Sequence, residues 1–183
     1  MNRLKQQYIE KVLPVLKAEL KLTNNLAVPS LEKIVVSVGV GNDESNHEKA
    51  MENVSEQLKV MTGHKPRVTK AKQAIAGFKL RAGDPVGLFV TLRGEFMWEF
   101  LDKLNSIVLP RVKDFQGIKK TAFDKQGNYN LGVAEQIVFP EIEYDKIDRI
   151  RGLQITVVTT AKNPKDSKRL LELLGMPFEK DEK

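Results

Sequence analysis

Residue types that commonly carry catalysis are sparse in this chain. It contains no cysteine, so disulfides, thiolate metal ligands and cysteine nucleophiles are excluded. Its only histidines, His47 and His64, do not form a zinc-binding helix motif, and no serine occupies a nucleophile elbow. We therefore expect no catalytic residue, no metal site and no cofactor.

Paired carboxylates are one arrangement in the sequence that is compatible with catalysis. Glu141 lies close to Glu143, and Asp145 lies close to Asp148. Such pairs could perform general acid–base chemistry, but nothing else in the sequence singles them out. We interpret them as solvated or helix-capping side chains.

A glycine pair provides the enzyme alternative that the sequence leaves open. Gly39 and Gly41 follow a predicted strand, as at the start of a dinucleotide-binding loop. The third glycine position of that motif is Glu44, and no Gly-Lys-Ser or Gly-Lys-Thr phosphate loop is present. We interpret the two glycines as room for a neighbouring backbone at a strand end, with a nucleotide-binding hydrolase as the alternative.

Positive charge is the chemistry that the sequence does concentrate. The chain carries 30 Lys and Arg against 24 Asp and Glu, a formal net charge of +6. The segment from Gln57 to Gly83 has no acid; its cations are Lys59, Lys65, Arg67, Lys70, Lys72, Lys79 and Arg81. The rest of the chain is close to neutral, and this distribution is typical of a surface that binds a polyanion. The alternatives are a solvated lysine-rich face or a membrane surface, although the segment is not an amphipathic helix with an aromatic apolar face.

Alternating helices and strands must position these cations. Apolar spacing predicts helices over 2–20, 46–61, 95–108 and 164–174, and strands over 31–40, 86–93 and 152–160, with 67–71 extended and short strands at 129–133 and 136–139. Pro14 should kink or divide the first helix, and Pro110 should end the third. This irregular alternation favours an α+β fold with helices on one face of a sheet.

The predicted strands have one aliphatic face and one face of short polar side chains. The polar positions are Ser37, Gly39, Thr91, Arg93, Asn130, Gly132, Gln154 and Thr156. Hydroxyls, amides and glycines let another backbone come close, and they can hydrogen-bond to phosphate, sugar and 2′-hydroxyl groups. A plain solvent-facing surface rich in strand-favouring Thr is the other interpretation.

Length and hydropathy favour a globular chain without a membrane segment. The 183 residues fit one domain, and the 41% of hydrophobic residues suffice for a core. No run of 18 apolar residues occurs, and charges interrupt the N-terminal segment MNRLKQQYIEKVLPVLKAEL, unlike a signal peptide. We expect a cytoplasmic protein with no membrane partner.

Short motifs spread along the whole chain carry a resemblance to a known family. They include TGHKP at 62–66, AKQAIAGFKLR at 71–81, GDPVG at 83–87, VTLR at 90–93, GNYNLG at 127–132, FPEI at 139–142 and LLGMPF at 173–178. In their order and spacing they resemble large-subunit ribosomal protein number five of bacteria, the family that binds 5S ribosomal RNA. The resemblance covers nearly all of the sequence.

The resemblance implies a non-catalytic ribosomal protein with a single domain over residues 1–183. It implies an α+β fold with a curved, mainly antiparallel sheet, helices packed on one face and an extended basic arm at about 65–87. The polar face (Ser37, Gly39, Thr91, Arg93, Asn130, Gly132, Gln154 and Thr156) would hold 5S rRNA in the central protuberance. Implied partners are 5S rRNA, large-subunit rRNA, the transfer RNA in the peptidyl site (P-site tRNA) and neighbouring ribosomal proteins, including one in the small-subunit head.

The arm would contact the elbow of P-site tRNA. Its implied contact residues are Lys70, Lys72, Gln73, Ile75, Gly77, Phe78, Lys79 and Arg81. A basic rim around a small apolar tip suits phosphates outside and base or sugar faces inside. The alternative is that Ile75 and Phe78 fold back into the core. Ser37 departs from the family pattern, since Asn is usual there. A free-standing RNA chaperone or regulator is the alternative function.

Overall fold

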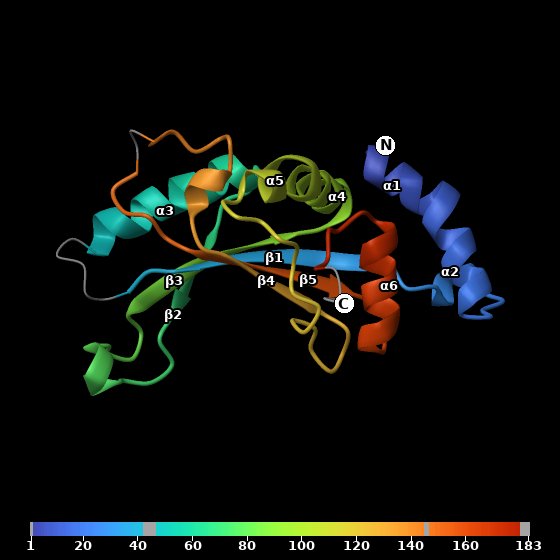
Figure 1. Cartoon of the computed structure of the whole chain (residues 1–183). Helices are drawn as coiled ribbons and strands as arrows, with labels where there is room; N and C mark the ends of the chain where they lie inside the picture. The colour runs from blue at the N-terminus through green and yellow to red at the C-terminus, as the bar shows by residue number, and fades with distance from the viewer. Residues whose placement is uncertain (1, 42–46, 145–146, 180–183) are drawn as a thin grey trace. The chain divides into compact units, whose positions relative to one another are not determined.

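The computed structural model describes residues 2–41, 47–144 and 147–179 and shows an antiparallel sheet with helices (Figure 1). The strands are β1 (Leu31–Gly39), β2 (Arg67–Lys70), β3 (Pro85–Leu92), β4 (Tyr129–Val133) and β5 (Leu153–Thr159), in the order β2-β3-β1-β5-β4. The α-helices are α1 (Arg3–Gln7), α2 (Leu13–Glu19), α3 (His47–Thr62), α4 (Gly94–Lys103), α5 (Leu109–Arg111) and α6 (Pro164–Leu173). The predicted α+β class is confirmed.

The chain divides into two compact units. The first unit comprises Met1–Ile34, Arg93–Leu131 and Thr156–Lys183, and the second comprises Val35–Leu92 and Gly132–Ile155. The boundaries fall inside β1, β4 and β5 instead of in linkers. A single domain over residues 1–183 stays a prediction.

Alternation of side chains along the strands separates a buried face from an accessible one. In β1, Ile34, Val36 and Val38 are buried, whereas Ser37 is half-buried and Gly39 is exposed. The same two-residue period holds throughout β5 and over Leu88–Leu92 of β3, because successive side chains of a strand point to opposite faces. In β4, Tyr129 and Val133 are buried and Gly132 between them is exposed. The predicted division into an aliphatic face and a polar face is confirmed.

In the second unit, α3 covers the aliphatic side of the strands (Figure 1). Its buried residues follow the spacing of one helix face: Ala50, Met51, Val54, Leu58 and Met61. The helix ends at Thr62 and is followed by Gly63, whose φ of +70° is the left-handed conformation that favours glycine after a helix. Burial of this stripe fixes the helix against β3.

In the first unit, α1 packs on α4 through apolar and charged contacts. The rings of Tyr8 and Trp98 lie 5.5 Å apart. Lys5 pairs with Glu95 at 2.5 Å, and Arg3 pairs with Asp102 at 2.6 Å. Both ion pairs are exposed and add little energy, so the buried rings account for most of this packing.

Both prolines within predicted helices follow a wider, π-type turn. Pro14 follows the turn Tyr8–Val12, and the helix continues without a break to Glu19, so Pro14 does not divide it. Pro110 follows the turn Leu104–Val108, and the helix continues through it to Arg111. The prediction that Pro110 ends the helix is therefore wrong. The wider turn makes room for the proline ring and absorbs its missing N–H donor.

The segment Gln136–Phe139, predicted as a short strand, is instead a single 3-10 turn over Gln136–Val138. Gln136 is buried and bonds to the chain near Arg151: its N–H donates to the Arg151 carbonyl at 3.1 Å, and its Nε2 donates to the Arg149 carbonyl at 2.8 Å. Its Oε1 accepts from the Arg151 N–H. Hydrogen bonds of the Gln136 side chain thus join this segment to residues 149–151, instead of the backbone bonds between two paired strands.

None of the helices in the described ranges has both the length and the apolar character needed to cross a membrane.

Candidate nucleic-acid interface

The basic arm is a long hairpin loop of the second unit, residues 71–84, between β2 and β3 (Figure 1). Two backbone hydrogen bonds close its base: the Ala71 N–H donates to the Asp84 carbonyl at 2.8 Å, and the Gly83 N–H donates to the Ala71 carbonyl at 2.9 Å. Residues 65–70 and 85–87 of the predicted arm instead lead into or form strands. The loop itself is thus shorter than predicted.

The tip of the arm has a defined backbone. Ile75 and Leu80 exchange two backbone hydrogen bonds of 3.0 and 3.1 Å around a 3-10 turn, Ala76–Phe78. Lys79 then adopts a φ of +52°, the left-handed region that side chains rarely occupy. These contacts hold Gln73 and Gly77, both exposed, on an ordered scaffold.

The apolar side chains of the tip face solvent. Phe78 is 68% exposed and Ile75 is 47% exposed, so the alternative that they fold back into the core is wrong. Lys70, Lys72 and Arg81 are exposed around them, and none forms an ion pair with another described residue. The acid that lies closest to the tip in sequence is Asp84, and its carboxylate accepts a hydrogen bond from the Arg81 backbone N–H at 2.7 Å. Cations and apolar groups are thus presented together.

The polar face has accessible hydrogen-bonding groups in the second unit. The hydroxyls of Ser37 and Thr91 are half-buried and have no hydrogen-bond partner among the described residues. Gly39 and Gly132 are exposed, and a Cβ on either would meet no atom within 4 Å. Gln154 is also exposed. Alternation along the strands places these five residues on one face, as predicted. On this face the backbone is accessible at the two glycines, and the hydroxyls of Ser37 and Thr91 are available to a ligand.

The polar face has a different character in the first unit. Thr156 Oγ1 donates to Asn130 Oδ1 at 2.8 Å, which fixes the orientation of the amide. Arg93 is exposed directly after β3, and its Nη1 lies 3.5 Å from a carboxylate oxygen of Glu32. This pairing was not predicted, because it joins two segments that are distant in sequence.

Two further residues, both in β2, lie on the polar face and were not predicted. Arg67 pairs with Phe89 and Thr69 pairs with Gly87 in the antiparallel register of β2 and β3. Directly opposed residues point to the same face, the one that also carries Thr91. Alternation within β2 hinted at this, but the register between strands was needed to assign the side.

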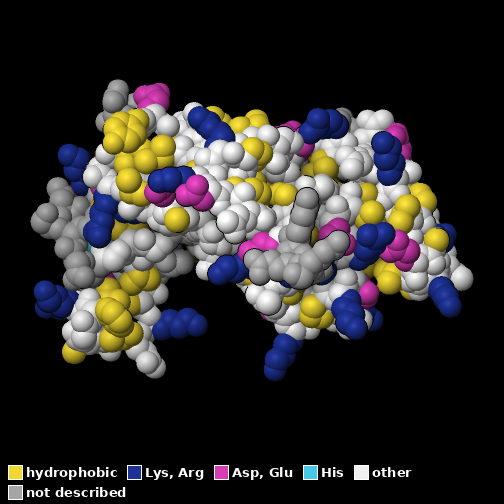
Figure 2. Space-filling view, in the orientation of Figure 1, with side chains coloured by type: hydrophobic (Ala, Val, Ile, Leu, Met, Phe, Trp, Pro, Cys, Tyr) yellow, Lys and Arg dark blue, Asp and Glu magenta, His cyan; other side chains and the backbone are white. Residues whose placement is uncertain are grey.

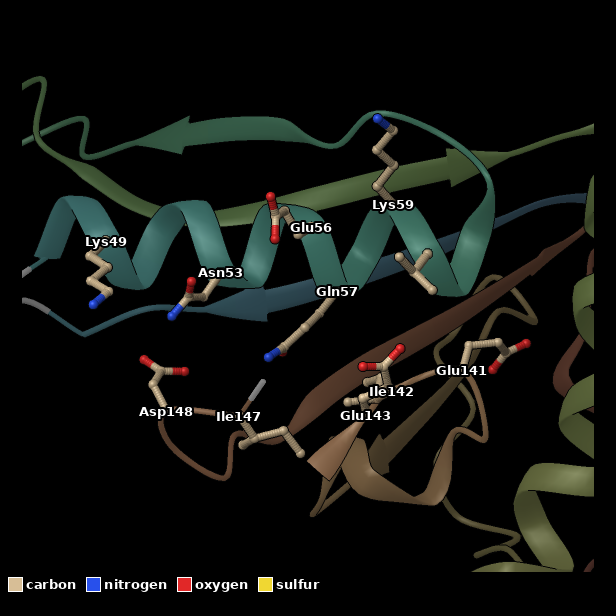
Figure 3. Close-up of a pocket in the computed structure, with 11 residues that line it drawn as sticks. Lys49, Asn53, Glu56, Gln57, Lys59, Glu141, Ile142, Glu143, Ile147 and Asp148 are labelled. Atoms are coloured by element: carbon tan, nitrogen blue, oxygen red, sulfur yellow. The ribbon is translucent and has the colours of Figure 1, made fainter. Parts of the chain in front are cut away.

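A cleft of about 740 Å³ lies within the second unit, between α3 and the residues 141–143 and 147–148 (Figure 3). It is lined by Lys49, Asn53, Glu56, Gln57, Lys59, Val60, Glu141, Ile142, Glu143, Ile147 and Asp148. The amide of Gln57 points into it, and its Nε2 is buried without a hydrogen-bond partner among the described residues. No pattern in the sequence indicated this cleft.

Of the predicted carboxylate pairs, Asp148 is held by an arginine. Asp148 accepts two hydrogen bonds from Arg151, at 2.8 and 2.9 Å. These bonds, with the Arg151 charge, outweigh burial and lower the pKa of Asp148 to about 2, so it is ionised at neutral pH. Asp145 lies outside the described residues. Within the described ranges, no three His, Asp or Glu side chains gather where they could hold a metal ion.

Two family models match the chain, one after the other. Residues 24–81 match the model of ribosomal protein L5, and residues 85–178 match the model of the C-terminal part of the same ribosomal family. The chain belongs to the ribosomal protein L5 family.

Family membership confirms several predictions. The L5 family consists of structural proteins of the large ribosomal subunit and not of enzymes, so the nucleotide-binding hydrolase is wrong. Membership implies that the chain assembles with rRNA and with other ribosomal proteins, in the ribosome of the cytoplasm. This assignment replaces the free-standing RNA chaperone or regulator.

Proposed function

We propose that this L5-family chain binds 5S rRNA through its polar face and helps to attach it in the central protuberance. The observation that carries the proposal is the pair of unused hydroxyls on Ser37 and Thr91, beside the open backbone of Gly39. A face without bulky side chains lets an RNA backbone approach closely, and hydroxyls bond to phosphate or 2′-hydroxyl oxygens.

The proposed 5S rRNA contacts include further residues in each unit. In the second unit they are Gly132 and Gln154, to which the register adds Arg67 and Thr69; in the first unit they are Arg93, Asn130 and Thr156. The two arginines supply positive charge to this face, and that of Arg93 lies 3.5 Å from a carboxylate oxygen of Glu32. A surface of this kind recognises RNA by shape and hydrogen bonding more than by charge.

The arm is proposed to contact P-site tRNA. Its proposed contact residues are Lys70, Lys72, Gln73, Ile75, Gly77, Phe78, Lys79 and Arg81, all exposed. The exposed ring of Phe78 can stack on a base or pack on a sugar, while the cations neutralise phosphates. The fixed backbone of the tip reduces the ordering cost of such a contact.

The residues 143–144 and 148–150, near the cleft beside α3, are proposed to contact a protein of the small-subunit head. Tyr144 is 74% exposed and Ile150 is 52% exposed, and the acids Glu143 and Asp148 lie near them in sequence. Exposed apolar side chains rimmed by polar groups are typical of protein–protein contacts.

Filter binding tests the 5S rRNA assignment. The affinity of the whole chain should be measured for 5S rRNA and for an unrelated RNA duplex of equal length over a salt series. We expect tighter binding to 5S rRNA at every salt concentration, with a decrease in affinity as salt rises. Equal affinity for both RNAs would contradict the proposal.

A further inference from the structure

A second group of cations lies in the first unit, outside the arm and the polar face. The hairpin loop that contains Lys125 meets the turn that leads into α6. Thr159 Oγ1 donates to the Gly127 carbonyl at 3.0 Å, and a Cβ on Gly127 would lie 3.1 Å from the Asn163 carbonyl oxygen. Segments that are more than thirty residues apart in sequence are therefore in contact.

This contact brings three lysines into one region, named here the lysine cluster. Lys125 lies two residues before Gly127. Lys162 precedes Asn163, and Lys165 follows it in the first turn of α6. All three are exposed, and Figure 2 shows Lys and Arg side chains projecting around this end of α6.

The loop that carries Lys125 has a fixed backbone. The carboxylate of Asp124 accepts hydrogen bonds from the Gln126 N–H at 2.9 Å, the Asn128 N–H at 2.7 Å and the Asn128 amide at 2.7 Å. Gly127 has a φ of +83°, which favours glycine. The one acid of the loop is thus directed at the loop's own N–H groups and does not pair with a lysine.

The cations of the cluster differ from their neighbours on α6. Lys168 pairs with Glu172 at 3.7 Å, and Arg169 pairs with Glu19 at 2.6 Å. Lys125, Lys162 and Lys165 form no ion pair with any described residue. Asp166, the nearest acid on the helix, accepts from the Asn163 amide at 3.5 Å. Charge is balanced on the later turns of α6 and unbalanced at its start.

We propose that the lysine cluster is a second RNA-binding surface, which takes the phosphate backbone of ribosomal RNA. This proposal rests on the proposed function, because it extends RNA binding to another surface, in the first unit. Lysine is a point charge on a flexible stem, so the cluster binds phosphates without reading sequence. The phosphates belong either to 5S rRNA or to large-subunit rRNA.

Salt titration of RNA binding tests the cluster. The triple variant K125Q/K162Q/K165Q is compared with the wild type and with K11Q/K21Q/K113Q, which removes three lysines of the same unit that lie outside the cluster. Affinities for 5S rRNA and for a large-subunit rRNA fragment are measured separately over a salt series. A plot of log affinity against log salt concentration has a negative slope. Removing one phosphate contact reduces the magnitude of that slope by about 0.7–0.9.

For one of the two RNAs, we expect the magnitude of the slope to be smaller by about 2 in the cluster variant than in the wild type. The RNA that shows this change is the source of the phosphates. The control variant should keep the wild-type slope. Equal slopes for the cluster variant and the control with both RNAs would overturn the proposal and leave the cluster a solvated face. Failure of the proposed function is seen separately, as equal affinity of the wild type for 5S rRNA and an unrelated duplex.

Discussion

Among single residues, Gly87 shows how the polar face depends on the absence of a side chain. It lies in β3, opposite Thr69 of β2. A Cβ at this position would lie 2.5 Å from the Val38 carbonyl oxygen and 3.3 Å from the Gly39 Cα. Both neighbours are backbone atoms, so β1 and β3 would have to separate to admit a methyl group.

Gly87→Ala should therefore destabilise the fold by about 1–3 kcal/mol, as other overpacking substitutions do. The control is Gly39→Ala, since Gly39 is exposed and a Cβ on it would meet no atom within 4 Å. Urea denaturation measures both variants. Equal free energies of unfolding for the two variants would show that the close approach of β1 and β3 is not a constraint.

Asp148 couples the stability of the second unit to pH. Its pKa is about 2 in the folded chain against an ordinary value of 3.8, mainly because Arg151 donates hydrogen bonds to it. The side chain of Arg151 is only 7% exposed, so removing the Asp148 carboxylate takes away the counter-charge of a buried cation. The stability from this pair is complete above about pH 4 and is lost as pH falls toward 2.

Asp148→Asn should lower the free energy of unfolding at pH 7 by roughly 1–3 kcal/mol. The difference from the wild type should shrink between pH 4 and pH 2, where the wild-type carboxylate also becomes neutral. Denaturation at pH 7, 4 and 2 measures this convergence. A constant difference across that range would show that the charge of Asp148 is not the cause.

At the scale of elements, the arm is stabilised by its own backbone and not by packing of its tip. The base is closed at Ala71 and Asp84, and the tip is closed at Ile75 and Leu80. Phe78 and its neighbouring cations remain exposed. Substitutions at the tip should therefore change RNA contacts and leave the fold intact.

K72Q/R81Q should weaken binding to tRNA about five- to tenfold at moderate salt, because the variant removes two phosphate contacts. The matched control is K49Q/K59Q, which removes the same charge from α3 of the same unit. Affinity for tRNA and the melting temperature are measured for both. If both variants bind tRNA equally well, the arm is not the tRNA contact.

The elements that were predicted correctly are those with a strong local pattern. β1, β3 and α6 occur within a residue or two of their expected bounds, because their apolar periods are long and uninterrupted. Pro110 did not end its helix, because a wider turn over Leu104–Val108 precedes it, and the apolar spacing does not predict such a turn. The 3-10 turn at Gln136 depends on bonds to Arg149 and Arg151, which no local pattern encodes.

For the whole molecule, the composition of the polar face could be predicted and its internal pairings could not. Ser37, Thr91 and Gln154 follow from the two-residue period of single strands. Arg67 and Thr69 required the register of β2 and β3, which a single strand does not specify. The cleft beside α3 likewise depends on two segments that meet only in the folded chain.

Charge alone would not have indicated the proposed 5S rRNA surface. The acid-free segment Gln57–Gly83 includes the end of α3 and strand β2 as well as the arm. The polar face is almost uncharged but carries unused hydroxyls beside open backbone. Our proposal therefore separates anchoring of 5S rRNA, by the polar face, from contact with tRNA, by the arm.

The affinity of S37A/T91V for 5S rRNA tests this assignment most directly. The variant removes two hydroxyls with little change in shape, so the fold should be retained. We predict that its affinity for 5S rRNA falls about tenfold, while K72Q/R81Q stays within about twofold of the wild type. A wild-type affinity for S37A/T91V, together with a large decrease for K72Q/R81Q, would contradict the assignment.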